Sequence, residues 1–161
     1  MPVGVKLKSV GSILVVALIA GGSCAPVDPR CAELAREDAY DFRVFPGLDQ
    51  DSQYEAYICA QQHRHPPILD LAFVYAAEGE SVARYLRVKL QSSPNDATTR
   101  DIIWVLRAIQ VRNTYAVRED EGLMSLARGK VATMRDPSLQ RFAQEWLSDI
   151  EASPSGPTQE R

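Results

Sequence analysis

Residues 136 to 150 read DPSLQRFAQEWLSDI, and this stretch gives the clearest indication of the fold. Asp136 can cap a helix, and Pro137 suits the first helical position because its fixed φ matches a helix and its missing N–H is not needed there. Apolar residues then recur at helical spacing, at positions 139, 142, 143, 146, 147 and 150. The pattern predicts an amphipathic helix over 137–150.

The same pattern of cap and apolar residues occurs once more, 41 residues earlier in the chain. This offset aligns helix caps with helix caps, and apolar or small residues with apolar or small residues. The aligned pairs are Val82 with Leu123, Leu86 with Ala127, Leu90 with Val131, Asn95 with Asp136, Ile102 with Ala143, Leu106 with Leu147, and Ile109 with Ile150. A period of about 40–47 residues built from two antiparallel helices is typical of α-solenoids.

At these residues the chain resembles HEAT-like repeats, which implies a short right-handed α-α superhelix of the HEAT and armadillo class. The part that resembles them most is the capped helix that begins at Asp136. One position departs from the pattern: Gln140 stands where such repeats commonly carry an Arg that contacts the neighbouring cap. The alternative is a plain four-helix array, because amphipathic helices of similar length align easily.

Helical spacing also extends upstream of the repeat. We expect further helices opened by Asp28-Pro29, by a cap at Asp51 or Ser52, and by Pro67, with the last of these ending at Gly79. The sequence therefore predicts one all-α domain of six to seven helices over residues 28–151. Residues 152–161 contain two prolines, one glycine and no large apolar side chain, and they are interpreted as a disordered tail.

Residues 1–24 have the pattern of a bacterial export signal, in which Lys6 and Lys8 precede a short apolar run and a small-residue segment. Cys24 closes this segment and is a candidate for lipidation, although Gly21 stands where a lipobox usually carries an apolar residue. Ordinary cleavage near Gly22 or Ala25 is the alternative. Either route predicts an exported protein, located in the periplasm or anchored to the membrane through lipid at Cys24.

Three cysteines are present, and an odd thiol is a liability in an oxidising compartment. Removal or lipidation of Cys24 leaves Cys31 and Cys59, which we expect to form a disulfide. Cys59, His63 and His65 could instead contribute to a metal site, because Cys59 and His63 share a helix face. The favoured interpretation is that the two histidines are basic residues at a helix C-terminus, and no metal or cofactor is expected.

The charge of the chain and the motifs that it lacks argue against several classes of function. The chain has 18 basic and 21 acidic side chains, and two of the basic ones lie in the signal, so the remainder carries a net charge of −5. No basic stripe is present to contact phosphates, which argues against nucleic acid as a partner. The sequence shows no nucleophile motif, no phosphate-binding glycine loop and no carboxylate that stands out, so no catalytic residue is assigned.

Aromatic residues in the expected helices are the remaining candidates. Tyr85, Trp104 and Tyr115 lie beside the apolar faces, where they could form a partner surface or fill the gap between helix layers. We therefore expect a non-enzymatic envelope protein, an exported α-solenoid that binds another protein. The alternative is an envelope hydrolase that acts on cell-wall glycan through a carboxylate in a helical groove.

Overall fold

The computed structural model describes residues 28–153, which form an all-helical structure with no β-strand in that range. The expected all-α class is therefore confirmed. The predicted signal over 1–24, with Cys24, and residues 154–161 of the predicted tail lie outside the described part. The seven helices are α1 (Pro29–Arg36), α2 (Gln50–Gln62), α3 (Leu71–Tyr75), α4 (Glu80–Gln91), α5 (Asp96–Val111), α6 (Glu121–Ala132) and α7 (Pro137–Ala152).

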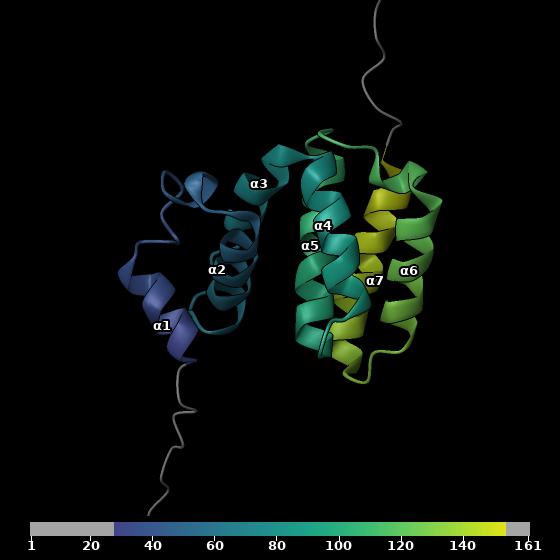
Figure 1. The fold of residues 1–161 in the computed structure, drawn as a ribbon. Helices are drawn as coiled ribbons and strands as arrows, with labels where there is room; N and C mark the ends of the chain where they lie inside the picture. The colour runs from purple at the N-terminus through teal and green to yellow at the C-terminus, as the bar shows by residue number, and fades with distance from the viewer. Residues whose placement is uncertain (1–27, 154–161) are drawn as a thin grey trace, which may run out of the picture.

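The helices are arranged in two parts joined by the short helix α3 (Figure 1). Helices α1 and α2 lie together at one end of the molecule, and α4 to α7 pack side by side at the other. Helices α5 and α7 make the most extensive contact between any two helices of the described chain, whereas α4 and α6 touch less. No described helix is long and apolar enough to cross a membrane.

Local capping explains where most helices begin. The side chains of Asp28, Asn95, Asp120 and Asp136 each accept a hydrogen bond from a backbone N–H in the first turn of the following helix. These contacts satisfy N–H groups that have no partner within the helix. The starts of α1, α5 and α7 agree with the caps predicted from the sequence.

Two expected starts are wrong. Helix α2 is capped by Asp49, whose carboxylate accepts hydrogen bonds from the N–H and the hydroxyl of Ser52, so the predicted caps at Asp51 or Ser52 lie inside the helix. Helix α3 begins at Leu71 and not at Pro67. The reason is tertiary: the Ile68 N–H donates to Ala60 O, and Gln61 Nε2 donates to Ile68 O at 2.8 Å, so this segment is bound to the end of α2.

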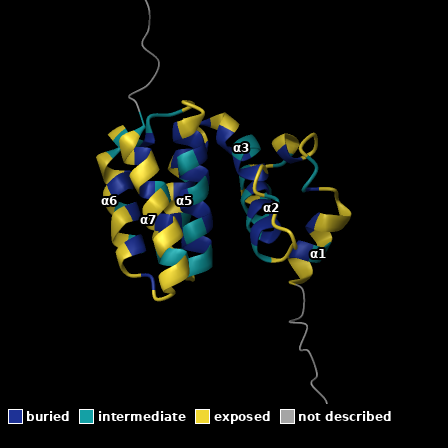
Figure 2. Ribbon diagram, turned by 180° about the vertical axis from the view of Figure 1, so that it is seen from behind, coloured by how far each residue is buried: buried dark blue, intermediate teal, exposed yellow. Residues whose placement is uncertain are grey.

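The 41-residue offset reappears in the helix bounds. Both ends of α6 lie 41 residues after those of α4, and both ends of α7 lie 41 residues after those of α5. All six aligned apolar pairs are buried at both positions. Figure 2 shows buried residues on α5, α6 and α7, with exposed residues along much of α6 and α7.

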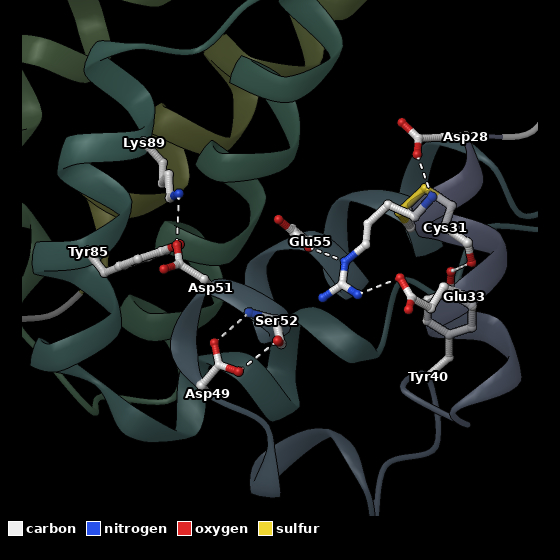
Figure 3. A network of polar contacts seen from close by, with 12 residues as sticks. Asp28, Cys31, Glu33, Tyr40, Asp49, Asp51, Ser52, Glu55, Tyr85 and Lys89 are labelled. Atoms are coloured by element: carbon white, nitrogen blue, oxygen red, sulfur yellow. Dashed lines mark hydrogen bonds and ion pairs between the residues drawn. A yellow bond between two sulfur atoms is a disulfide. The ribbon is translucent and has the colours of Figure 1, made fainter.

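The N-terminal helix is held by a covalent bond, because Cys31 and Cys59 form a disulfide as predicted. Around it, Arg30 donates to Glu55 at 2.7 Å and to Glu33 at 2.8 Å, and the Tyr40 hydroxyl donates to the carbonyl of Cys31 (Figure 3). Leu34, Ala39 and Phe45 add fully buried side chains to this end of the molecule. Helix α1 is thus attached to α2 by both covalent and noncovalent contacts.

Candidate binding surface

The three aromatic residues selected from the sequence have different surroundings. Tyr85 lies half-buried between α4 and α2, where its ring packs edge-on against Tyr54 with centroids 5.9 Å apart. Tyr115 follows α5, and its hydroxyl donates to Asp120 at 3.1 Å. Trp104 contacts Phe73 of α3 and Trp146 of α7. The structure therefore does not place the three residues on one common patch.

Tyr85 belongs to a polar contact between two helices. Asp51 of α2 accepts hydrogen bonds from the Tyr85 hydroxyl at 2.5 Å and from Lys89 Nζ at 3.0 Å, both on α4 (Figure 3). The hydrogen bonds from Tyr85 and Lys89 lower the pKa of Asp51, and burial together with the carboxylate raises the pKa of Tyr85 to about 12. The Tyr85 hydroxyl is therefore used within the fold, where this cluster connects α2 to α4.

Trp104 lines a hollow of about 180 Å³ on the α5–α7 side of the molecule. Its wall is mainly apolar, and its lining residues come from the end of α2, the 63–70 segment, α5 and α7: Gln61, Pro67, Leu69, Arg100, Asp101, Trp104, Phe142 and Trp146. We call this hollow the aromatic groove. Leu69 and Phe142 are 53% and 42% exposed, so apolar surface in the groove is open to solvent.

Ring packing fixes the shape of the groove. Trp104 and Trp146 have centroids 4.7 Å apart, Phe142 stacks on Trp146 at 6.2 Å, and Phe73 meets Trp104 edge-on at 5.9 Å. The Trp104 indole N–H donates to the carbonyl of Leu69 at 3.3 Å. These contacts hold the aromatic side chains of the groove in fixed positions.

One buried carboxylate, that of Asp101, is among the groups that line the groove. Asp101 is almost fully buried, and it accepts hydrogen bonds from Arg100 Nε at 2.8 Å and from Gln62 Nε2 at 2.9 Å. Burial raises its pKa, and the charge of Arg100 acts in the opposite direction. Both carboxylate oxygens accept hydrogen bonds from neighbouring side chains, so Asp101 links Gln62 of α2 to α5 beside the groove.

Arginines surround the groove, and they differ in their partners. Arg107 lies over the Trp104 ring and pairs with Asp149 at 2.6 Å, and Arg100 pairs with Asp101. Arg141 lies 5.5 Å from the centre of the Phe142 ring and forms no ion pair with any residue in the described range. Arg141 is therefore an arginine that contacts the groove residue Phe142 and forms no ion pair within residues 28–153.

In the structure Cys59 is not available as a ligand for the metal site considered with His63 and His65. The Cys59 sulfur is bonded to Cys31, so it supplies no thiolate ligand. Within residues 28–153, no group of three or more His, Cys, Asp or Glu residues is arranged to hold a metal ion.

Of the eight residues that line the groove, only Trp104 was selected from the sequence, and the large apolar side chains that were missed are Leu69, Phe142 and Trp146. Phe142 and Trp146 were interpreted as core residues because they belong to the apolar stripe of the last helix. In the structure Ala143, Leu147 and Ile150 occupy the core, whereas Phe142 is exposed and Trp146 half-buried. The available signal was the width of that stripe, which exceeds what one core-facing side of a helix needs.

No protein-family model, no curated protein and no solved structure matches this chain.

Proposed function

We propose that this protein is an exported binding module, a short α-solenoid of HEAT-like repeats whose α5–α7 side binds another protein. The observation that carries the proposal is the aromatic groove. It combines exposed apolar side chains with a pre-packed tryptophan pair, and exposed apolar surface that is contiguous and shaped typically marks interaction sites. Tryptophan is also among the residues that dominate binding energy at protein interfaces.

The similarity of the two helical hairpins, α4 with α5 and α6 with α7, supports the solenoid arrangement. Their bounds differ by the same 41 residues, and α5 packs more closely on α7 than α4 does on α6, as expected if α5 and α7 form the inner, concave side. Asp96 adds a contact between hairpins, because its carboxylate accepts hydrogen bonds from the N–H groups of Arg135 and Asp136 at 2.7 and 2.8 Å. Gln140, which replaces the usual Arg, donates to the carbonyl of Val131.

Export is supported by the disulfide. Structural disulfides persist in oxidising compartments and are uncommon in the cytosol of most organisms. The bond between Cys31 and Cys59 therefore agrees with the export signal expected in residues 1–24 and with a location in the periplasm or on a membrane through lipidated Cys24.

A glycan hydrolase is the second candidate, and one observation favours it. Asp101 has a raised pKa and lies beside two tryptophans, a combination that suits a general acid near a sugar-binding wall. Glycosidases ordinarily use two carboxylates, and Asp101 is the only one among the residues that line the groove. Its oxygens are also engaged by Arg100 and Gln62. The binding function is therefore preferred.

Affinity capture from envelope extracts, with two matched surface variants, tests the proposal. Phe142→Ala removes an exposed groove side chain, and Val88→Ala removes an apolar side chain that is 65% exposed on α4. We expect a polypeptide that the parent protein and Val88→Ala retain and Phe142→Ala loses. Retention that is equal in all three would contradict a groove-centred interaction. In a parallel digestion assay, release of sugar fragments from purified peptidoglycan that is abolished by Asp101→Asn would favour the hydrolase.

A further inference from the structure

Resting on the proposed binding function, we infer that the aromatic groove accepts an uncharged peptide segment that inserts one large apolar side chain. The size of the groove limits the anchor. A hollow of about 180 Å³ with a mainly apolar wall has room for one large side chain but not for the face of a helix or a second domain. A Phe, Leu or Trp side chain in this hollow would cover apolar surface of Leu69 and Phe142 that is exposed to solvent.

The lining of the groove disfavours a charged anchor. Arg100 and Asp101 are the only charged residues among the eight that line it, and their side chains pair with each other. A charged side chain that entered the hollow would lose hydrating water without meeting an unpaired opposite charge. Burying a charge in this way is costly, so the anchor should be uncharged.

The charges around the groove balance, which defines the residues on either side of the anchor. With histidine counted as neutral, four arginines and four carboxylates lie within three residues along the chain of a lining residue: Arg64, Arg100, Arg107 and Arg141 against Asp70, Asp101, Glu145 and Asp149. Two ion pairs join Arg100 to Asp101 and Arg107 to Asp149. A segment of either net charge would gain little attraction from this balanced surface, and an uncharged segment is its electrostatic complement.

A glycan is also uncharged, but it fits the groove less well than an apolar side chain does. Sugar recognition needs hydrogen-bonding groups for the hydroxyls, and donors of the lining are used within the fold. Gln61 donates to the carbonyl of Ile68, and the Trp104 indole N–H donates to the carbonyl of Leu69. An apolar anchor needs neither donor.

Selection from a random peptide library against the purified full chain tests this inference. We expect enriched sequences to share an aromatic or large aliphatic residue whose neighbours are depleted in Asp, Glu, Lys and Arg. Enrichment of acidic or basic sequences, or no enrichment, would overturn the inference. Binding of peptidoglycan-derived oligosaccharides that depends on Phe142 would also overturn it, in favour of a glycan.

Variants then locate the binding of a selected peptide. Phe142→Ala should weaken it about tenfold or more, as loss of an important interface side chain does. Phe42→Ala is the matched control, because Phe42 is a phenylalanine of similar exposure, 47% against 42%, in the loop that follows α1. This control should leave the binding unchanged, and equal effects of the two variants would contradict the inference.

Salt dependence tests the charge of the bound segment. Raising sodium chloride from about 50 to about 500 mM should change the affinity less than about twofold, because screening weakens only charged contacts. Arg64→Gln and Glu145→Gln should each have an equally small effect. A larger loss with salt, or with either charge variant, would show that ion pairs carry the binding and would overturn the inference.

The two proposals can fail separately. A polypeptide captured from the envelope in a Phe142-dependent manner, whose contact segment proves to be acidic or basic, would leave the binding module standing and remove the inference of an uncharged segment. Capture that does not depend on Phe142 would remove the groove-centred function itself.

Discussion

At the scale of single residues, Asp51 is the clearest case of a surface side chain that joins two helices. Its carboxylate accepts hydrogen bonds from Tyr85 and Lys89, and the hydrogen bond from Tyr85 is the main cause of its lowered pKa. A carboxyl group whose pKa is lower in the folded state stabilises the fold above its unfolded pKa, and this contribution is lost as the pH falls through the folded pKa.

Asp51→Asn should therefore lower the melting temperature at neutral pH by a small amount, because the group is exposed and well screened. The difference from the parent protein should shrink as the pH falls below about 3.8, the ordinary value for Asp. Thermal unfolding followed by circular dichroism across this range measures it. Tyr85→Phe is the control, since it removes the main donor and should reduce the acid dependence. A difference that is constant at all pH values would contradict the assignment.

At the scale of elements, α1 is the helix most dependent on a single bond. It has only eight residues, too few to be stable alone, and the disulfide closes a loop between Cys31 and Cys59 with a sequence separation of 28. Closing a loop of this length stabilises a protein by about 3–4 kcal/mol in the chain-entropy description.

Replacement of both cysteines by serine should lower the free energy of unfolding by about that amount, and it should expose the amides of α1 to hydrogen exchange before those of α5 and α7. Urea unfolding and hydrogen exchange measure the two effects. Arg30→Gln, which breaks only exposed ion pairs, should lower the free energy of unfolding far less than loss of the cross-link does. An equal cost for both changes would show that the cross-link contributes little.

The sequence predicted the elements best where the deciding interaction is local. Asp28, Asn95 and Asp136 cap helices through residues two or three positions away, so their short-range patterns were sufficient. The predicted start of α3 was wrong because Ile68 forms hydrogen bonds with Ala60 and Gln61. These contacts depend on how the chain turns after α2. The predicted cap of α2 was wrong because Asp49, Asp51 and Ser52 are all suitable cap residues by local sequence. In the structure Asp49 is the cap, and Asp51 instead accepts a hydrogen bond from Tyr85 of α4.

At the scale of the whole molecule, we expect the α5–α7 contact to make the largest contribution of any helix pair to the free energy of unfolding. Leu147 is buried there and Trp146 packs on Trp104, so Leu147→Ala should cost about 2–5 kcal/mol and Trp146→Ala a substantial part of that range. Deletion of residues 154–161, which contain no large apolar side chain, should be nearly neutral. Melting temperatures compare the three variants, and a deletion as damaging as Leu147→Ala would contradict this distribution.

Location is also a property of the whole chain. If Cys24 is lipidated, Cys24→Ser should abolish partitioning into detergent and leave unprocessed precursor, because acylation needs the thiol. An ordinary secreted protein would be cleaved and stay in the aqueous phase with or without the substitution. Phase partitioning and the mass of the N-terminal peptide measure the outcome, and a wild-type protein without an acyl group would exclude the anchor.

The groove shows where prediction from sequence ends. Trp104 was recognised as lying beside an apolar face, but the residues around it come from three other segments of the chain: Leu69 from the 63–70 segment, Phe73 from α3, and Phe142 and Trp146 from α7. None of these is related to Trp104 by helical periodicity, and only the packing of α3 and α7 onto α5 brings them together. The helices could be predicted from spacing, whereas the surface depended on how they pack.

The disulfide also determines how the chain transmits a mechanical load. Fully extended, the stretch from Cys31 to Cys59 would reach roughly 90–100 Å, but the bond holds the two Cα atoms 5.4 Å apart. A pull applied on the N-terminal side of Asp28 therefore passes through the sulfur atoms to Cys59, near the end of α2. The closed loop of residues 32–58, which carries Leu34, Phe45 and most of α2, bears no tension. Under oxidising conditions that loop cannot be extended, and the segment after Cys59, which leads from the last turn of α2 toward α3, becomes the first part of the fold beyond the cross-link to bear the force.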